Sequence, residues 1–317
     1  MKVLVTGAAG FVGDALCRHL ASAGHIVEGT FRTIPENRSW MQVHATGDLM
    51  GMDNFSPILD GVDAVVHLAA RVHIMRETEA NPDAIYLKAN AELTERLALA
   101  ATEAGVSRFV LLSSIKANGE STGDDTTHTE TDAPAPENAY GRSKLAAEEK
   151  LTAIAEKSTM TSVSLRIPLV YGPGVGANFA SLLNICDMPL PLPLGGATRN
   201  RRSLLYIGNL TAAIETVLTA HRVASGTYLL ADGEDLSTAD LVRRLRGCLN
   251  RSHFSLPIPP AIITRLAGLA GKSAAADRLF GSLRVGAEKF RHDFSWNPPF
   301  TVDQGLAATA ARVRAPR

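Results

Sequence analysis

The sequence lacks most of the features that would place it in a specialised class of protein. Its 32 basic and 32 acidic side chains leave no net charge, which argues against nucleic-acid binding. Its three cysteines show no CxxC spacing, so we expect a reducing, cytoplasmic location rather than a disulfide framework. No uncharged apolar run reaches the roughly 18 residues of a membrane span. The histidines show no metal-ligand spacing such as HExxH, so no metal site is expected.

What the sequence does contain begins close to its first residue. Val3–Val5 is a short aliphatic run, the turn TGAAGFVG follows at residues 6–13, and a helical pattern continues to Ala23. A strand, a glycine turn and a helix in this order are typical of a loop that binds the pyrophosphate of a dinucleotide. Gly7 allows the tight turn, Gly10 lets the backbone approach the phosphates, and Gly13 lets the helix pack on the strand.

The second expected strand, His25–Phe31, bears on the choice of cofactor. In an NAD site such a strand usually ends in an acid that accepts hydrogen bonds from the adenosine ribose, but here Arg32 follows. A guanidinium suits a 2′-phosphate, so we expect NADP(H) as the preferred cofactor, with NAD(H) as the alternative. In the competing interpretation Arg32 lies in solvent and Glu28 accepts the hydrogen bonds of the ribose. Asp48 is a candidate for the adenine edge or an ordinary exposed loop acid.

Further buried strands at 63–70 and 108–112 alternate with a helix at 93–104. This alternation predicts an α/β fold with a Rossmann-type, doubly wound parallel sheet, whose ligands bind beyond the carboxyl ends of the strands. We expect residues 1–170 to form this domain, with about 201–225 returning to it. Residues 171–200 and 226–317 are expected to form a smaller, mixed α/β substrate-binding lobe.

A catalytic hypothesis comes from Tyr140 and Lys144, which are four residues apart and share one face of the predicted helix. The usual meaning of such a pair is a solvated helix face. Ser114 changes that interpretation, because it stands at a strand end on the same edge of the sheet as the glycine loop. A nearby ammonium and an oxidised nicotinamide would lower the pKa of the phenol, which is otherwise about 10, so that Tyr140 could exchange a proton with a substrate oxygen held by Ser114.

Five segments together resemble the extended short-chain dehydrogenase/reductases, and specifically the NAD-dependent epimerase/dehydratase family that acts on nucleotide sugars. They are TGAAGFVG, HLAA (67–70), SSIKANGE (113–120), the Tyr140-x-x-x-Lys144 pair and RIPLVYGPG (166–174). RRSLLYIGNL (201–210) and FSWNPPF (294–300) extend the likeness over essentially the whole chain. The resemblance implies a nucleotide-sugar substrate and a homodimer.

The resemblance also implies roles for individual residues. Tyr140 would be the acid/base, Lys144 would hold the nicotinamide ribose and Ser114 would orient the reacting oxygen. The remaining cofactor contacts would come from Gly7, Gly10, Phe11, Val12, Gly13, Arg32, Asp48, Leu49, Leu68, Ala69, Ala70, Asn90, Ile167 and Val170. The substrate contacts would come from Asn178, Leu192, Arg202 and Arg278. The neighbouring Arg201 could take the place of Arg202. The segment around Leu192 has an alternative interpretation as an extended Pro-rich connector.

Two departures from the family narrow the expected chemistry. Dehydratases carry an Asp-Glu pair where Ile115 and Lys116 stand, so dehydration is disfavoured. The missing ribose acid favours an enzyme that consumes NADPH, and SSIKANGE is similar to enzymes that reduce a 4-keto-6-deoxy sugar nucleotide, of the UDP-linked N-acetylhexosamine type, in surface-polysaccharide synthesis. The alternatives are a UDP-glucose-type 4-epimerase with tightly bound NAD and a non-catalytic NADP-sensing protein. Asn178 and Arg202 argue against a hydrophobic ketone as substrate.

Overall fold

The computed structural model describes residues 1–317 except 37, 73–80, 270, 272 and 315–317. Seven parallel strands form one sheet in the order β3-β2-β1-β4-β5-β6-β9. Their bounds are β1 Lys2–Thr6, β2 Ile26–Phe31, β3 Gln42–Ala45, β4 Ala64–His67, β5 Arg108–Ser114, β6 Thr161–Ile167 and β9 Gly226–Leu229. The strand order reverses direction between β1 and β4, which is the topology of a doubly wound Rossmann sheet. The predicted fold class is therefore confirmed.

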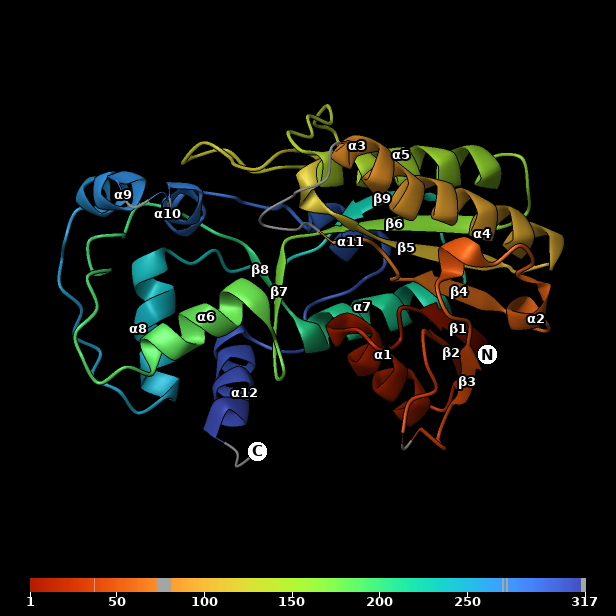
Figure 1. The fold of residues 1–317 in the computed structure, drawn as a ribbon, viewed down its shortest axis with the longest axis horizontal. Helices are drawn as coiled ribbons and strands as arrows, with labels where there is room; N and C mark the ends of the chain where they lie inside the picture. Colours follow the sequence, from red (N-terminus) through yellow and green to blue (C-terminus); the bar gives the residue numbers. More distant parts are fainter. Residues whose placement is uncertain (37, 73–80, 270, 272, 315–317) are drawn as a thin grey trace.

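Helices cover both faces of this sheet (Figure 1). On β1 the side chains alternate, so that Val3 and Val5 join one buried cluster and Leu4 the other. Helices α1 (Phe11–Ser22) and α7 (Ile207–Thr219) pack on the first face. The second face carries α2 (Ser56–Leu59), α4 (Leu93–Glu103) and α5 (Ala139–Ala155), with α3 (Pro82–Tyr86) beside α5. Burial on both faces explains why the central strands β1, β4 and β5 carry unbroken apolar runs.

A smaller group of elements packs beside the carboxyl end of the sheet (Figure 1). Its two parallel strands are β7 (Leu169–Tyr171) and β8 (Leu204–Tyr206). Its helices are α6 (Ala177–Cys186), α8 (Thr238–Cys248), α9 (Pro260–Leu269), α10 (Ser273–Phe280) and α12 (Val302–Arg314). Tyr171, Phe179 and Leu306 are among the side chains of its separate core.

One boundary expected from the sequence is wrong. Residues from 226 onward were assigned to the smaller lobe, but β9 pairs with β6 as the edge strand of the main sheet. Tyr228 enters the core beneath α7, where Phe290 of α11 (Glu288–Asp293) meets it edge-on at 5.9 Å between ring centroids. The apolar run at 227–230 has the pattern of a strand, but that pattern does not say which sheet the strand joins.

Candidate active site

The glycine loop between β1 and α1 has the geometry of a phosphate cradle. Gly7 has a φ of +71°, and a Cβ added to it would lie 2.9 Å from the main-chain nitrogen of Ala69. A Cβ on Gly13 would overlap the oxygen of Gly7, so the helix can pack this closely only without one. Gly10 precedes α1, and no described side chain caps the amide groups of its first turn. These amides, together with the half-buried Phe11 and Val12, fit a pyrophosphate.

The end of β4 is fastened to this loop by Thr6. Its Oγ1 accepts hydrogen bonds of 3.2 Å from the main-chain nitrogens of Leu68 and Ala69 and lies 2.7 Å from Nδ1 of His67. Burial lowers the pKa of His67 to about 3, and the charge of Lys144 adds to this effect. His67 is therefore neutral, and it is buried beside Thr6. Leu68, Ala69 and Ala70 lie half-buried at the edge of the site.

The end of β2 bears on the expected contacts of the adenosine ribose. Glu28 is buried and occupied: its carboxylate lies 2.7 Å from Nζ of Lys2 and 2.6 Å from Nε2 of His44. It is therefore not available for a ribose. Arg32 lies exposed directly after the strand. Asp48 is also exposed and accepts a 3.1 Å hydrogen bond from the nitrogen of Met50, while Leu49 is buried beneath it.

Ser114, Tyr140 and Lys144 are brought together at the carboxyl end of β5 and the start of α5. The amide oxygen of Asn138 caps α5 by accepting a 2.8 Å hydrogen bond from the nitrogen of Gly141, which fixes the turn that carries Tyr140. Burial raises the pKa of Tyr140 to about 12, whereas a hydrogen bond with Ser114 lowers it. The phenol is therefore protonated at neutral pH and needs a further positive charge to act as a base.

Lys144, one turn after Tyr140 on α5, is buried. Its Nζ donates a 2.8 Å hydrogen bond to the oxygen of Leu112, and burial lowers its pKa to about 8 against the raising effect of Glu148. Asn90, expected as a cofactor contact, lies against Arg71 and Ser143. Its Oδ1 accepts a 2.8 Å hydrogen bond from the main-chain nitrogen of Arg71. Its Nδ2 donates to the main-chain oxygen of Arg71 at 3.1 Å and to Oγ of Ser143 at 2.8 Å. These hydrogen bonds hold the chain at Arg71 against α5.

A buried ionic network behind the site was not foreseen from the sequence. The carboxylate of Glu148, one turn after Lys144, accepts three hydrogen bonds of 2.7–3.1 Å from Arg166 and another from Ser113. Nη1 of Arg166 donates at 2.9 Å to Asn118. Tyr140, Lys144 and Glu148 are spaced by four residues each, so their spacing was the signal that this charge lies on the buried helix face.

The expected substrate residues lie in different environments. Arg202 donates at 3.0 Å to the oxygen of Gly281; burial lowers its pKa and the nearby charge of Glu120 raises it, which places Arg202 toward the active-site loop. Arg201 instead bonds the oxygens of Thr198 and Asn200. Asn178 is exposed in the first turn of α6, and Arg278 is half-buried on α10.

Leu192 does not present a free side chain to a ligand. It is buried in the core of the smaller lobe, and its oxygen accepts a 2.8 Å hydrogen bond from the nitrogen of Leu256. Ile167 is buried at the end of β6, paired with Ser114, and Val170 lies half-buried on β7.

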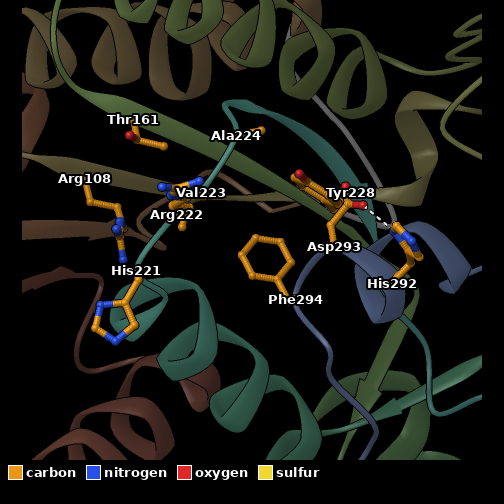
Figure 2. A pocket seen from close by; sticks show the side chains of 10 residues that line it. All are labelled: Arg108, Thr161, His221, Arg222, Val223, Ala224, Tyr228, His292, Asp293 and Phe294. Atoms are coloured by element: carbon orange, nitrogen blue, oxygen red, sulfur yellow. Dashed lines mark hydrogen bonds and ion pairs between the residues drawn. The ribbon is translucent and has the colours of Figure 1, made fainter.

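A cavity of about 690 Å³ lies away from these residues, at the amino ends of β5, β6 and β9 (Figure 2). Arg108 contributes to its wall while bonding the last carbonyls of α7, and Asp293 lies 2.9 Å from Nδ1 of His292. A parallel sheet binds its ligands at the opposite edge. The cavity is therefore separate from the candidate active site.

A dinucleotide cradle beside a Ser-Tyr-Lys group on a Rossmann sheet defines a short-chain dehydrogenase/reductase. Residues 3–231 match the NAD dependent epimerase/dehydratase family, and the chain belongs to that family. The resemblance inferred from the motifs is thus confirmed, and the chain is an enzyme of this family. In the part of the chain that is described, no helix is long and apolar enough to cross a membrane, and no three metal-ligating side chains are grouped to hold an ion.

Among curated proteins, the chain is 39% identical to the UDP-glucose 4-epimerase of Vibrio cholerae over 98% of this chain and 94% of that protein. It is 27% identical to the 2-alkyl-3-oxoalkanoate reductase of Stenotrophomonas maltophilia over 96% and 97%. Among solved structures, the UDP-N-acetylglucosamine 4-epimerase from Bacillus cereus has a TM-score of 0.81 at 20% identity, covering 99% and 100%. The Thermus thermophilus UDP-glucose 4-epimerase, solved with NAD, has a TM-score of 0.77 at 22% identity, with both chains fully covered.

Proposed function

We propose that the enzyme is a nucleotide-sugar 4-epimerase of the UDP-glucose type, which uses tightly bound NAD. The observation that carries the proposal is the Ser114–Tyr140–Lys144 group at the mouth of a glycine cradle, in a chain 39% identical to a UDP-glucose 4-epimerase over nearly its full length. Ile115 and Lys116 stand where dehydratases carry a carboxylate pair, which disfavours dehydration. Interconversion at carbon 4 needs one acid/base only.

In this proposal each side chain has one task. Ser114 holds the 4-oxygen of the sugar, and Tyr140 takes its proton. Lys144 holds positive charge beside the phenol and so favours the phenolate. Arg202, with Asn178 and Arg278, binds the diphosphate. A bound dinucleotide supplies the hydride acceptor and the further positive charge that Tyr140 requires.

The test starts with protein purified without added nucleotide. We expect it to release NAD on denaturation and to convert UDP-galactose to UDP-glucose, and the N-acetylated pair as well, as seen by proton NMR of the sugars. No interconversion of either pair, with or without added NAD, would overturn the proposal.

The second candidate is reduction of a 4-keto-6-deoxy UDP-N-acetylhexosamine by NADPH, and the end of β2 favours it. Glu28 is held by Lys2 and His44, while Arg32 is exposed directly after β2, and a guanidinium suits a 2′-phosphate. In this case the purified protein would carry no NAD and would oxidise NADPH only with the keto sugar. Arg32→Asp would then change the preference toward NADH by about tenfold or more, because the variant repels the 2′-phosphate.

A further inference from the structure

The carboxylate of Glu120 lies between two segments of the candidate active site, although it has no task in the proposed reaction. Its side chain is 28% exposed. Its Oε1 accepts a 2.9 Å hydrogen bond from Nζ of Lys116, which lies two residues after Ser114. The same oxygen accepts a hydrogen bond from Nδ2 of Asn138, which lies two residues before Tyr140. One carboxylate oxygen thus contacts both the segment that follows Ser114 and the start of α5.

Asn138 joins this carboxylate to the helix. While its Nδ2 donates to Glu120, its Oδ1 accepts the 2.8 Å hydrogen bond from the nitrogen of Gly141 that caps α5. The oxygen and nitrogen of a side-chain amide lie in one plane and cannot move independently. The contact with Glu120 therefore fixes the orientation of the cap, and with it the first turn of α5, in which Tyr140 lies.

Two further contacts bring the same segments together. Oε1 of Glu137 accepts a 3.1 Å hydrogen bond from the main-chain nitrogen of Glu120. A Cβ added to Gly141 would lie 2.5 Å from the main-chain oxygen of Lys116, so the first turn of α5 packs directly on that residue. We call this group the Glu120 clamp; it consists of Lys116, Glu120, Glu137 and Asn138.

The clamp joins the two elements whose spacing matters for proton transfer. Ser114 ends β5, Tyr140 lies in the first turn of α5, and a hydrogen bond joins their hydroxyl groups. General acid–base catalysis needs the two atoms that exchange a proton within about 3.2 Å of each other. A misplacement of about 1 Å can lower a rate by about a hundredfold. Contacts that set the distance between the end of β5 and the start of α5 therefore bear on turnover.

We propose that Glu120 is a positioning residue, whose carboxylate acts through Asn138 to fix the spacing between the hydroxyl groups of Ser114 and Tyr140. The carboxylate serves as a hydrogen-bond acceptor, and Lys116 holds it in place. Glu120 itself exchanges no proton with the substrate. This role rests on the tasks given to Ser114 and Tyr140 in the proposed function, but it does not depend on which sugar is bound.

The experiment measures steady-state kinetics with UDP-galactose as a function of pH. Glu120→Ala should lower kcat about tenfold and leave KM within about twofold of wild type, because the variant disturbs the reacting groups rather than the binding of the sugar nucleotide. Glu120→Gln should keep kcat within about threefold of wild type, because the amide oxygen still accepts from Asn138. Both variants lack the same charge. The acid limb of the kcat profile should nevertheless lie at higher pH in Glu120→Ala, since loss of the Ser114 hydrogen bond raises the pKa of Tyr140.

Asn138→Asp provides a complementary variant. It keeps an oxygen that caps α5 but loses the donor to Glu120, so kcat should fall as in Glu120→Ala. Combining Asn138→Asp with Glu120→Gln exchanges donor and acceptor and should recover most of the loss. Glu95→Ala is the matched control, because its carboxylate bonds Lys150 further along α5, and it should keep the kcat of wild type.

Hydrogen exchange of residues 141–146, followed by mass spectrometry without substrate, tests the clamp independently of the reaction. Exchange there should be faster in Glu120→Ala than in wild type and unchanged in Glu95→Ala. Thermal unfolding shows whether each variant is folded.

Three kinetic results would overturn the proposal: Glu120→Ala as active as wild type, Glu120→Gln as slow as Glu120→Ala, or a combined variant no more active than Asn138→Asp alone. If wild type itself does not convert UDP-galactose, the proposed function fails. Unchanged hydrogen exchange in Glu120→Ala would then overturn the positioning role as well.

Discussion

The ammonium group of Lys144 donates a 2.8 Å hydrogen bond to the main-chain oxygen of Leu112, two residues before Ser114 on β5. This bond joins the helix that carries Tyr140 to the strand that carries Ser114. It also holds a positive charge in a buried place, where burial lowers the pKa of the amine from its ordinary 10.5 to about 8. The site is therefore fixed by an interaction that has a cost in free energy.

That cost predicts a pH dependence of stability. Between pH 8 and 10.5 the folded protein has lost the Lys144 proton and the unfolded chain has kept it, so the free energy of unfolding rises with pH across this window. In Lys144→Met this contribution is absent. The difference in the free energy of unfolding between wild type and variant should change by up to about 3 kcal/mol from pH 7 to pH 10, in favour of wild type. Urea unfolding of cofactor-free protein measures it.

The matched control for this prediction is Lys150→Met, on the same helix. Its ammonium pairs with Glu95 on the protein surface. The free energy of unfolding of this variant, plotted against pH, should run parallel to that of wild type. A profile of Lys144→Met that also runs parallel to wild type would contradict the assignment of a buried charge.

Removing the phenol oxygen in Tyr140→Phe should lower kcat by about a thousandfold, because the variant lacks the hydroxyl proposed to carry the proton. Cofactor affinity and thermal stability should change little, since the ring is kept. Tyr86→Phe is the control: this ring meets Tyr140 edge-on at 6.3 Å, and its hydroxyl donates to the oxygen of Val72. It should keep activity within a few-fold of wild type. Steady-state kinetics would refute the role of Tyr140 if both variants were equally active.

Gly13→Ala should abolish tight dinucleotide binding and lower the free energy of unfolding by about 1–3 kcal/mol, because the added methyl group overlaps the oxygen of Gly7. Gly51→Ala is the control, since a Cβ there meets no atom within 4 Å. Isothermal titration with the dinucleotide and urea unfolding separate the two effects. Unchanged affinity in Gly13→Ala would mean that the loop is not the phosphate site.

Glu148→Gln should be destabilising by about 3–5 kcal/mol, because it leaves the buried charge of Arg166 without its partner. Adding Arg166→Met should recover much of this loss, because both charges are then absent. The free energies of unfolding of wild type, of each single variant and of the double variant form a double-mutant cycle. Additive losses would show that the pair does not act as a unit.

Much of the fold was predictable because its signals are local. The strand–turn–helix at residues 2–22 and the alternation of later elements follow from periodicity and glycine placement. The Thr-x-x-Gln spacing at 301–304 is a further local signal, and it forms a capping box: Thr301 and Gln304 exchange hydrogen bonds of 2.8 and 3.2 Å at the start of α12. Each of these features depends on residues close together in the chain.

The remainder depends on contacts between distant residues. The sequence cannot show that β9 joins β6, that Lys2 and His44 occupy Glu28, or that Leu192 faces a core. Nor can it separate Arg201 from Arg202, since adjacent residues differ only in which way the folded chain directs them. Motifs are local and these placements are not, which explains why the family could be inferred more readily than the reaction.

The most direct test of the account follows an isotope rather than a rate. UDP-galactose carrying deuterium at carbon 4 is incubated with the purified enzyme, and the UDP-glucose formed is analysed by NMR and mass spectrometry. The account predicts that the product keeps deuterium at carbon 4, because the hydride leaves and returns at one carbon while Tyr140 moves only the oxygen-bound proton. Loss of the label to water, or a keto product that accumulates without return of the label, would contradict it.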